Sequence, residues 1–580
     1  MERSAIDFPP RETSRSRPAR RRHEALDALL VLLLALAVRI AAWPWAANDS
    51  IDHTFRVWIA WRWAEDPFPL TYGVWGPLHF VMMGPLIRLF GDPIVTPVVL
   101  HIVLGALIAP LVYLFARREF ESPDGALMAG VAFALYPVAV LNSLSVRAET
   151  PFTLFLALAI LALARARARD LYRWPILAGL LLTLASGIRY EGWMLTPLLA
   201  LVLWPRWRKM VAFLAAASLV PLVWMLSNQL IYGDPIWGIT WAATHELQGM
   251  GKAGLDLQDR VGQFVTFMLR TVGGLTLPLA VLAAAGAVLT VLRRQQQVVW
   301  LVPAIGLAVL LFAAAARGAL VPKLNYTETF GLLAVPFVAA LMPASGSLPA
   351  VRTGVAALYG LVVVVMAALL VVGSLRDVPG LRERSAILAR IPAVNPVPMR
   401  PARAELDRLV AAIAPIVASP KAGFVSDTFG FADMGYVALE SRVHPTRFYF
   451  PPDTPIADLD ARPADADIPL RYRSFPLIGN IPGELDQYFR RYPEGVLLLQ
   501  PGSRFAAWLD YRAPGSARLR DVLLHLDPIV SVSWPKPDDP RLLGPGERPG
   551  GWGQLIAFRY AVVDPAGRGI ARWRDPTLGS

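Results

Sequence analysis

The sequence predicts a polytopic α-helical membrane protein with about 11 transmembrane helices and a C-terminal soluble α/β domain. Of its 580 residues, 55% are hydrophobic and only 17% are charged, whereas a soluble domain carries about 25% charged residues. The apolar residues gather in runs such as 26–42, 98–116 and 361–372. These runs approach the roughly 20 residues that an α-helix needs to cross a bilayer. After residue 375 such runs stop, and Pro, Arg and Asp become frequent.

The charges of the links orient the predicted spans. Seven Arg residues lie in the tail 1–25, and the links expected on the same side are short and dense in Arg and Lys. Because cytoplasmic loops carry an excess of cations, this side is predicted to be the cytoplasm of a bacterial inner membrane. The predicted spans lie at 26–47, 94–116, 126–143, 151–165, 175–188, 192–205, 210–231, 271–292, 298–316, 329–343 and 353–374.

The segment 75–90 is apolar but short, and it contains Gly76, Pro77 and Arg88. If it crossed the membrane, every later cation-rich link would face outward. We therefore expect it to lie in the membrane interface. Residues 48–93 then form one long external loop of the membrane domain 26–375.

Residues 376–580 are predicted to form a small mixed α/β domain in the periplasm, because eleven spans leave the C-terminus outside. Its helices are expected at 405–415 and 484–491, its strands at 423–426, 495–500, 529–534 and 555–563, and its loops at 451–469 and 535–551.

The net charge of +12 does not indicate a nucleic-acid-binding protein, because the cations lie in the tail and in the links between apolar runs. Membrane lipids are the expected surroundings. The absence of cysteine excludes disulfides, iron–sulfur clusters and thiolate–zinc sites. No cofactor is indicated by the sequence, and a divalent metal stays open.

The outer ends of the predicted helices collect carboxylates and cations. Asp49 and Asp52 follow the first helix, where a carboxylate can act as a general base or cap the next helix. Arg147 and Glu149 precede Pro151 at the next outer turn. Their alternative role is a charged start of a proline-led helix.

Further polar residues lie at the same predicted face. Arg189 and Glu191 interrupt an apolar hairpin, a placement that is costly unless each meets a partner or a ligand. Lys323 and Tyr326 occupy a later outer link, where a cation can bind phosphate or anchor the chain at the interface. Arg39, inside the first helix, either reaches the headgroups or faces a lipid phosphate.

The loop 232–260 contains Trp237, Trp241 and His245. Its aromatic residues suit either an interfacial belt or a surface for a sugar ring. A polar chamber at the outer leaflet is the simplest arrangement that unites all these groups.

The order of these motifs resembles the GT-C superfamily, and in particular the protein O-mannosyltransferase and lipid A aminoarabinose transferase family. That family has an essential Asp in its long first external loop, then an interfacial helix, a proline-containing segment and a Leu-Phe-Gly turn. The matching residues are Asp52 to Arg56, Gly76-Pro77-Leu78-His79, Leu89-Phe90-Gly91, Glu149-Thr150-Pro151, Arg189 to Gly192, and Asn325-Tyr326. The chain departs from the family at Arg56, where a tyrosine is usual, and at His53, where a glutamate is familiar.

The resemblance covers about residues 26–345 and implies an inverting glycosyltransferase. A polyprenyl-phosphate sugar would be the donor, and a lipid, glycan or protein of the cell envelope would be the acceptor. The implied catalytic residues are Asp52 as general base, Asp49 in reserve, and Glu149. The residues expected to bind the donor phosphate or sugar are Arg39, Arg147, Arg189, Glu191, Lys323, Tyr326, His79 and His245.

Two other classes of protein remain open. A transferase of whole glycans is the first, although the Trp-Trp-Asp signature of oligosaccharyltransferases is absent. A transporter or a glycan-binding scaffold is the second. Transporters, however, tend to carry internal repeats and charges near the membrane midplane, whereas the charges here gather at one predicted face.

Overall fold

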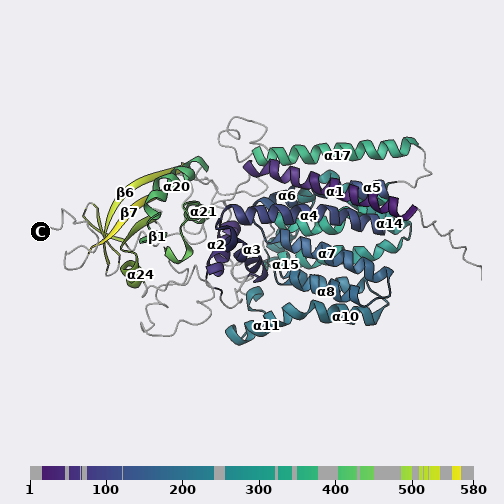
Figure 1. Cartoon of the computed structure of the whole chain (residues 1–580), viewed down its shortest axis with the longest axis horizontal. Helices are drawn as coiled ribbons and strands as arrows, with labels where there is room; N and C mark the ends of the chain where they lie inside the picture. The colour runs from purple at the N-terminus through teal and green to yellow at the C-terminus, as the bar shows by residue number, and fades with distance from the viewer. Residues whose placement is uncertain are drawn as a thin grey trace, which may run out of the picture.

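The structure of the protein is a computed structural model. It describes residues 16–45, 51–65, 67, 75–120, 122–240, 255–320, 324–342, 349–375, 403–426, 432–449, 485–499, 509–513, 515–519, 522–535 and 552–563. A helical bundle extends along the long axis of the molecule, and a sheet domain occupies one end (Figure 1). Helices α2 and α3 lie between the two parts (Figure 1).

Every predicted span overlaps a helix. The helices of the bundle are α1 (Ser16–Ala42), α4 (Val95–Glu119), α5 (Pro123–Ala134), α6 (Pro137–Leu144), α7 (Glu149–Ala168), α8 (Arg173–Ser186), α9 (Glu191–Leu201), α10 (Trp207–Ala217), α11 (Leu219–Tyr232), α13 (Leu257–Leu275), α14 (Leu277–Leu292), α15 (Leu301–Ala316), α16 (Thr327–Ala334) and α17 (Pro349–Leu375). Short 3-10 helices lie at η1 (Trp43–Trp45), η2 (Gln296–Trp300), η3 (Leu324–Tyr326) and η4 (Val335–Leu341). Within the described ranges, four helices are long and apolar enough to cross a membrane, or up to seven if each bent pair is one span. The predicted number of eleven therefore stays a prediction.

Several predicted spans are broken into two helices. The segment 126–143 bends by 44° between α5 and α6, where Pro137 opens α6. The bend between α13 and α14 is 94°, at Thr276 with a φ of 65°. Pro lacks the N–H group that continues a helix, and a positive φ ends one. The loop prediction for 232–260 is wrong at its end, because α13 begins at Leu257.

The segment 48–93, which we predicted to be one external loop, contains two helices, α2 (Ile51–Glu65) and α3 (Leu78–Phe90). Helix α3 matches the segment that we predicted to be interfacial, and it ends at Gly91, whose φ is 70°. The Gly76 backbone lies so close to Gly187 that an added Cβ would overlap the Gly187 carbonyl. The Leu78 N–H also donates to this carbonyl, at 3.1 Å. The start of α3 is thereby fixed against the α8–α9 turn.

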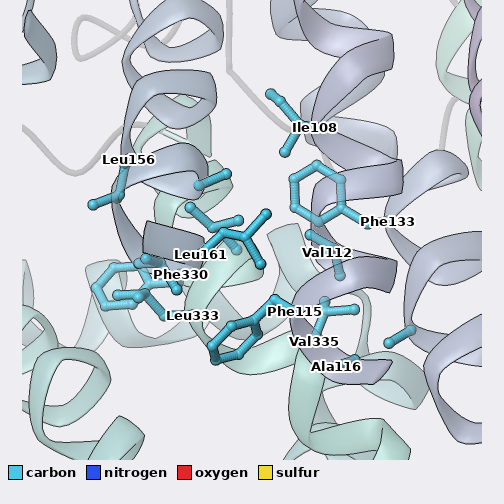
Figure 2. Packing of buried hydrophobic residues seen from close by; sticks show 14 of the residues in the cluster. Ile108, Val112, Phe115, Ala116, Phe133, Leu156, Leu161, Phe330, Leu333 and Val335 are labelled. Carbon is cyan, nitrogen blue, oxygen red and sulfur yellow. The ribbon is translucent and has the colours of Figure 1, made fainter. Parts of the chain in front are cut away.

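The bundle encloses one extended apolar core. Ile108, Val112 and Phe115 of α4 face Phe133 of α5 in it, and Leu161 of α7 lies beside them (Figure 2). Within a bilayer, the van der Waals packing of such side chains holds helices together. The core thereby fixes the helices whose connecting turns carry the polar residues.

The C-terminal domain is a seven-stranded mixed sheet of order β2-β1-β3-β7-β6-β5-β4. β1 pairs in parallel with β2 and β3, and the other pairs are antiparallel. The elements are α20 (Arg403–Val417), β1 (Ala422–Ser426), α21 (Ala432–Glu440), η5 (Pro445–Arg447), β2 (Phe448–Tyr449), α24 (Leu485–Arg491), β3 (Glu494–Leu499), β4 (Leu509–Ala513), β5 (Ser516–Leu519), β6 (Val522–Pro535) and β7 (Trp552–Val563). The predicted α/β class is confirmed, with every predicted helix and strand present.

Alternate residues of the sheet enter two different cores. Phe424 packs into a core shared with α20 and α2, whereas Val425 packs into a core that contains Phe489 of α24. This follows from the period of two along a strand. The short strands β2, β4 and β5 and the helix α21 were not predicted. The predicted loop 451–469 lies outside the described residues, as does 535–551 apart from Pro535 at the end of β6.

Candidate functional site

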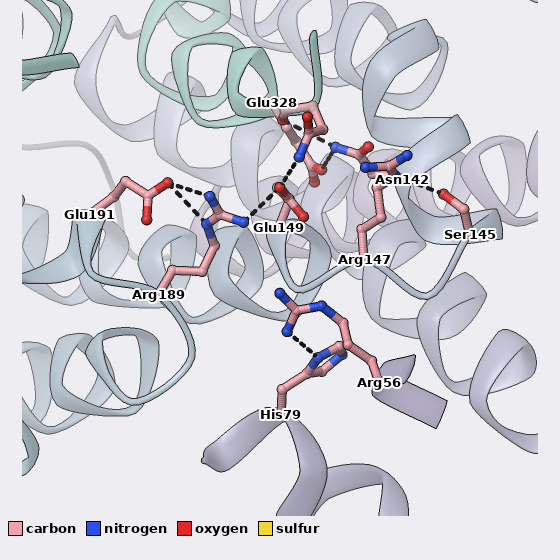
Figure 3. A network of polar contacts seen from close by, with 10 residues as sticks. Arg56, His79, Asn142, Ser145, Arg147, Glu149, Arg189, Glu191 and Glu328 are labelled. Atoms are coloured by element: carbon pink, nitrogen blue, oxygen red, sulfur yellow. Dashed lines mark hydrogen bonds and ion pairs between the residues drawn. The ribbon is translucent and has the colours of Figure 1, made fainter. Parts of the chain in front are cut away.

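Arg189 lies at the centre of a charged network in the turn between α8 and α9. Its Nη1 is 2.6 Å from Glu149 Oε1, and its Nη2 is 2.5 Å from Glu191 Oε1. The guanidinium also lies 4.9 Å from the centre of the Tyr326 ring. Figure 3 shows Arg189 between the two carboxylates. The structure thus brings together four predicted site residues that come from three separate segments of the sequence.

A second carboxylate lies behind Glu149. Asn142 of α6 donates from Nδ2 to Glu328 Oε2 at 2.7 Å and to the Asn325 carbonyl at 3.3 Å. Asn325 in turn donates to Glu149 Oε1. Both carboxylates are buried, and a buried charge is tolerated only where it is paired and hydrogen-bonded.

Arg39 belongs to this network rather than to the lipid surface. It is fully buried, and it donates to Ser143 Oγ at 3.0 Å and to the carbonyls of Ala35 and Ala134 at 3.1 and 3.4 Å. It also interacts electrostatically with Glu328. A guanidinium that reaches the headgroups would be exposed, so the interpretation of Arg39 as a snorkelling residue is wrong.

Arg147 follows an unusual turn between α6 and α7. Val146 has a φ of 48°, a conformation that β-branched residues rarely adopt and that tends to occur at functional sites. Arg147 donates from Nε to Ser145 Oγ at 3.2 Å. Its side chain is half-buried. In Figure 3, Glu149 lies between Arg147 and Arg189.

A second cluster lies below this network and joins α2, α3 and α4. Arg56 Nη1 is 3.3 Å from His79 Nδ1, and His79 Nε2 is 2.8 Å from His101 Nε2. The Arg56 guanidinium lies 4.5 Å from the centre of the Trp75 ring. Figure 3 shows Arg56 and His79 facing the Arg189–Glu149 pair. His79 was predicted as a site residue, whereas Arg56 and His101 were not.

A small cleft opens beside Arg189. It is lined by Gly76, Pro77 and Gly187 and by the aromatic rings of Tyr190, Trp193 and Trp224. Trp224 Nε1 donates to the Tyr190 hydroxyl at 3.2 Å. The cleft has free space for about one water molecule, so it marks a narrow opening beside Arg189.

Four predicted site residues are not described at the level of their side chains. Asp52 is the second residue of α2, and its side chain lies outside the described part of the structure. Asp49, Lys323 and His245 lie outside the described residues altogether. Among the residues that the structure does describe, no group of three or more His, Asp or Glu is placed to hold a metal ion.

The sequence carried a signal for the residues that we missed. Asn142 and His101 are buried polar residues inside apolar runs, and a polar group in such a run marks a functional site by default. The predicted site residues were mostly charged groups at helix ends, whereas these two lie within the helices. Arg56 was noted only as a departure from the family pattern.

Comparison with known proteins finds one family model and two solved structures that are similar to this chain. Residues 75–228 match the family model described as dolichyl-phosphate-mannose-protein mannosyltransferase. No curated protein sequence matches the chain. The chain is similar to the crystal structure of ArnT from Cupriavidus metallidurans bound to undecaprenyl phosphate, with 15% identity, a TM-score of 0.54, and coverage of 82% of this chain and 93% of that one. The apo structure of the same protein matches with 13% identity, a TM-score of 0.53, and coverage of 82% and 92%. The family model thus matches one part of the membrane domain, and the two solved structures show that the chain shares their fold at low sequence identity.

Proposed function

We propose that the protein transfers a sugar from a polyprenyl-phosphate donor to a lipid, glycan or protein acceptor of the cell envelope. The observation that carries this proposal is the buried cluster of Arg189, Glu149 and Glu191, which lies beside Arg56 of α2 (Figure 3). Helix α2 begins with Ile51 and Asp52. The similar fold of a protein whose crystal structure holds undecaprenyl phosphate supports the class of donor.

The leaving group of such a transfer is a phosphate ester that gains negative charge in the transition state. Cations that are fixed in place before the reaction stabilise that charge most effectively. Arg189 is held by two carboxylates, and Arg56 by a histidine and a tryptophan ring. We assign the donor phosphate to these two residues together with Arg147. Lys323 stays a predicted phosphate-binding residue and lies outside the described part of the chain. Glu191 and Tyr326 hold Arg189.

Asp52 is the proposed general base, and the transfer is proposed to be inverting. Its carboxylate takes the proton from the acceptor hydroxyl as this oxygen attacks the anomeric carbon, and the bond from that carbon to the phosphate oxygen breaks. One displacement without a covalent sugar–enzyme intermediate inverts the anomeric configuration. Asp49 is the reserve base, and Glu149 orients the reacting groups through Arg189.

The reaction is proposed to take place at the extracytoplasmic face. The cation-rich links lie at the opposite ends of the helices, and the sheet domain lies on the same side as α2 and α3 (Figure 1). This arrangement supports the proposal of a C-terminal domain in the periplasm. It also supports a site on the side of the membrane where polyprenyl-linked sugars would meet envelope acceptors.

The test is sugar transfer by the purified protein in liposomes without an ion gradient. Asp52→Asn is expected to abolish transfer and to leave the amount of folded protein unchanged. Asp124→Asn is a matched control, because Asp124 is an exposed residue in the first turn of α5. If Asp52→Asn stays active and Asp49→Asn does not, the assignment of the base is wrong. If the wild-type protein moves donor lipid across the bilayer but forms no product, the proposed activity is wrong.

The sugar and acceptor can be identified in cells. A deletion strain is expected to lack one surface sugar and to accumulate its polyprenyl-phosphate carrier, because the transfer step is missing. Profiling of the lipids and envelope glycans identifies both together. Accumulation of a diphosphate-linked oligosaccharide would instead indicate a transferase of whole glycans.

A further inference from the structure

Arg56, His79, His101 and the Pro97 carbonyl form a continuous chain of polar contacts. The Arg56 Nη1 to His79 Nδ1 distance is 3.3 Å, and the two imidazoles meet through their Nε2 atoms at 2.8 Å. His101 Nδ1 lies 2.7 Å from the carbonyl oxygen of Pro97. Both imidazoles are fully buried.

The two ends of this chain fix its direction. A guanidinium only donates hydrogen bonds, and a backbone carbonyl only accepts them. His79 therefore accepts at Nδ1 and donates from Nε2–H, and His101 accepts at Nε2 and donates from Nδ1–H. Both rings are neutral, because a protonated ring would place two donors against each other in one of these contacts.

The chain of contacts links helix α2, whose second residue is Asp52, to the membrane bundle. Arg56 lies one turn after Asp52 on α2, His79 is in the first turn of α3, and His101 lies inside α4. His101 is anchored by its own helix, through the carbonyl four residues earlier. The Trp75 ring holds the other side of the Arg56 guanidinium. An Arg side chain has many rotamers, and these contacts leave it few.

We propose that His79 and His101 are positioning residues that hold the Arg56 guanidinium in place for the phosphate of the donor. This inference rests on the proposed function, since it assumes an anionic ligand at Arg56. Neither imidazole need touch the donor. His79 contributes the Nδ1 atom that accepts from Arg56, and His101 contributes the Nε2 atom that accepts from His79.

The sharpest test compares two substitutions at His101. Gln places Oε1 near the position of Nε2 and can still accept from His79, whereas Phe fills the space and cannot. Thr290→Val is the matched control, because Thr290 is equally buried, donates to the Gly286 carbonyl and lies in α14, away from the site. Binding is measured with undecaprenyl phosphate as the probe, and steady-state kinetics give KM for donor and acceptor separately.

His101→Phe is expected to weaken binding of undecaprenyl phosphate about tenfold and to raise the donor KM by a similar factor, with the acceptor KM unchanged. His101→Gln should stay within about threefold of the wild type, and Thr290→Val should match it. If His101→Phe binds the probe like the wild type, or if Gln and Phe behave alike, the proposal is overturned.

A second pair of variants covers the possibility that His101→Phe does not fold. His79→Asn keeps an acceptor near the Nδ1 position and is expected to bind the probe, whereas His79→Leu is expected to lose it. If all four variants lose folded protein, His79 and His101 serve stability alone and the proposal is wrong. If the wild type binds the probe but transfers no sugar, the proposed activity fails, and the binding comparison still decides the role of the two histidines.

Discussion

Trp58 of α2 packs its indole ring against the phenyl ring of Phe448 in β2, with the ring centroids 4.5 Å apart. Both side chains are buried in a core that contains residues of α2 and α3 as well as of the sheet domain. Trp61 adds an edge contact with His444 at 5.0 Å, and Glu65 Oε2 lies 2.7 Å from His444 Nε2. The C-terminal domain therefore packs on the helix whose first turn carries Asp52.

Truncation of this contact tests the coupling between the two parts. Trp58→Ala is expected to lower the free energy of unfolding by about 3–5 kcal/mol, because it removes a fully buried aromatic ring and leaves a cavity. Thermal unfolding in detergent measures this loss. Sugar transfer should fall as well, since α2 loses its support.

Trp204→Ala serves as the control, because Trp204 is 69% exposed. The melting temperature of the Trp204→Ala variant in detergent should stay close to that of the wild type. Equal stability of Trp58→Ala and Trp204→Ala would show that the shared core does not support α2.

Gly435 of α21 provides a second test of the same interface. A Cβ at this position would lie 2.6 Å from Thr54 Oγ1 on α2, closer than side-chain contacts allow. Gly435→Ala should push α21 away from α2 and lower the rate of sugar transfer several-fold, although Ala is the better helix former. Gly354→Ala in α17 is the control, since a Cβ there meets nothing within 4 Å. Unchanged transfer in Gly435→Ala would mean that the spacing of the two helices does not affect the site.

The positions of the bundle helices were largely predictable, because each helix coincides with a local run of apolar residues. What was not predictable is where these runs break. The 94° bend between α13 and α14 depends on a positive φ at Thr276, a residue that carries no strong turn signal. In the sheet domain, β6 and β7 show long apolar patterns. β5 is a short strand that pairs with β6, and β4 is a short edge strand that pairs with β5.

The candidate site was partly predictable for a related reason. Arg189, Glu149 and Glu191 interrupt apolar segments. Placing a charged group in a membrane costs free energy, so such residues are candidates for a functional site. Their mutual contacts could be expected only from the topology of the spans. The contact of Arg56 with His79 joins α2 to α3. The sequence does not predict how these two helices pack against each other, so this contact is known only from the tertiary structure.

Asp92 makes the stability of the interface dependent on pH. Burial alone would raise the pKa of this carboxyl group, but the N–H groups of Val95 and Ile94 and the Arg442 guanidinium lower the pKa below its ordinary value. The unfolded chain therefore takes up the proton at a higher pH than the folded protein. The stabilisation is complete above about pH 4 and is lost as the pH falls below it.

Asp92→Ala is expected to lower the free energy of unfolding by about 0.5–2 kcal/mol at pH 7, because Asp92 Oδ1 caps the start of α4 at 2.8 and 3.0 Å. The difference from the wild type should shrink as the pH falls below about 4. Asp92→Asn keeps an acceptor oxygen without the charge, so it separates the cap from the ion pair with Arg442. A difference between wild type and Asp92→Ala that grows with acidification would contradict this assignment.

Arg189 provides the most direct test of the charged network. Its planar guanidinium contacts Glu149 and Glu191 at the same time, and a lysine ammonium, as a point charge, cannot reproduce this fork. Arg189→Lys should therefore reduce the rate of sugar transfer by about 10²–10³, the usual cost of removing one fixed group that stabilises transition-state charge. Arg208→Lys is the control, because Arg208 is exposed at the opposite end of the bundle.

The loss in Arg189→Ala should be partly reversed by added guanidinium at millimolar concentration, because the substitution vacates the space between Glu149 and Glu191 that the side chain fills. Thermal unfolding of each variant separates lost catalysis from lost folding. If Arg189→Lys retains full activity with an unchanged donor KM, then Arg189 balances the buried carboxylates and does not bind the donor. The phosphate would in that case have to be bound by Arg56 and Arg147, and substitution of either one should produce the large loss instead.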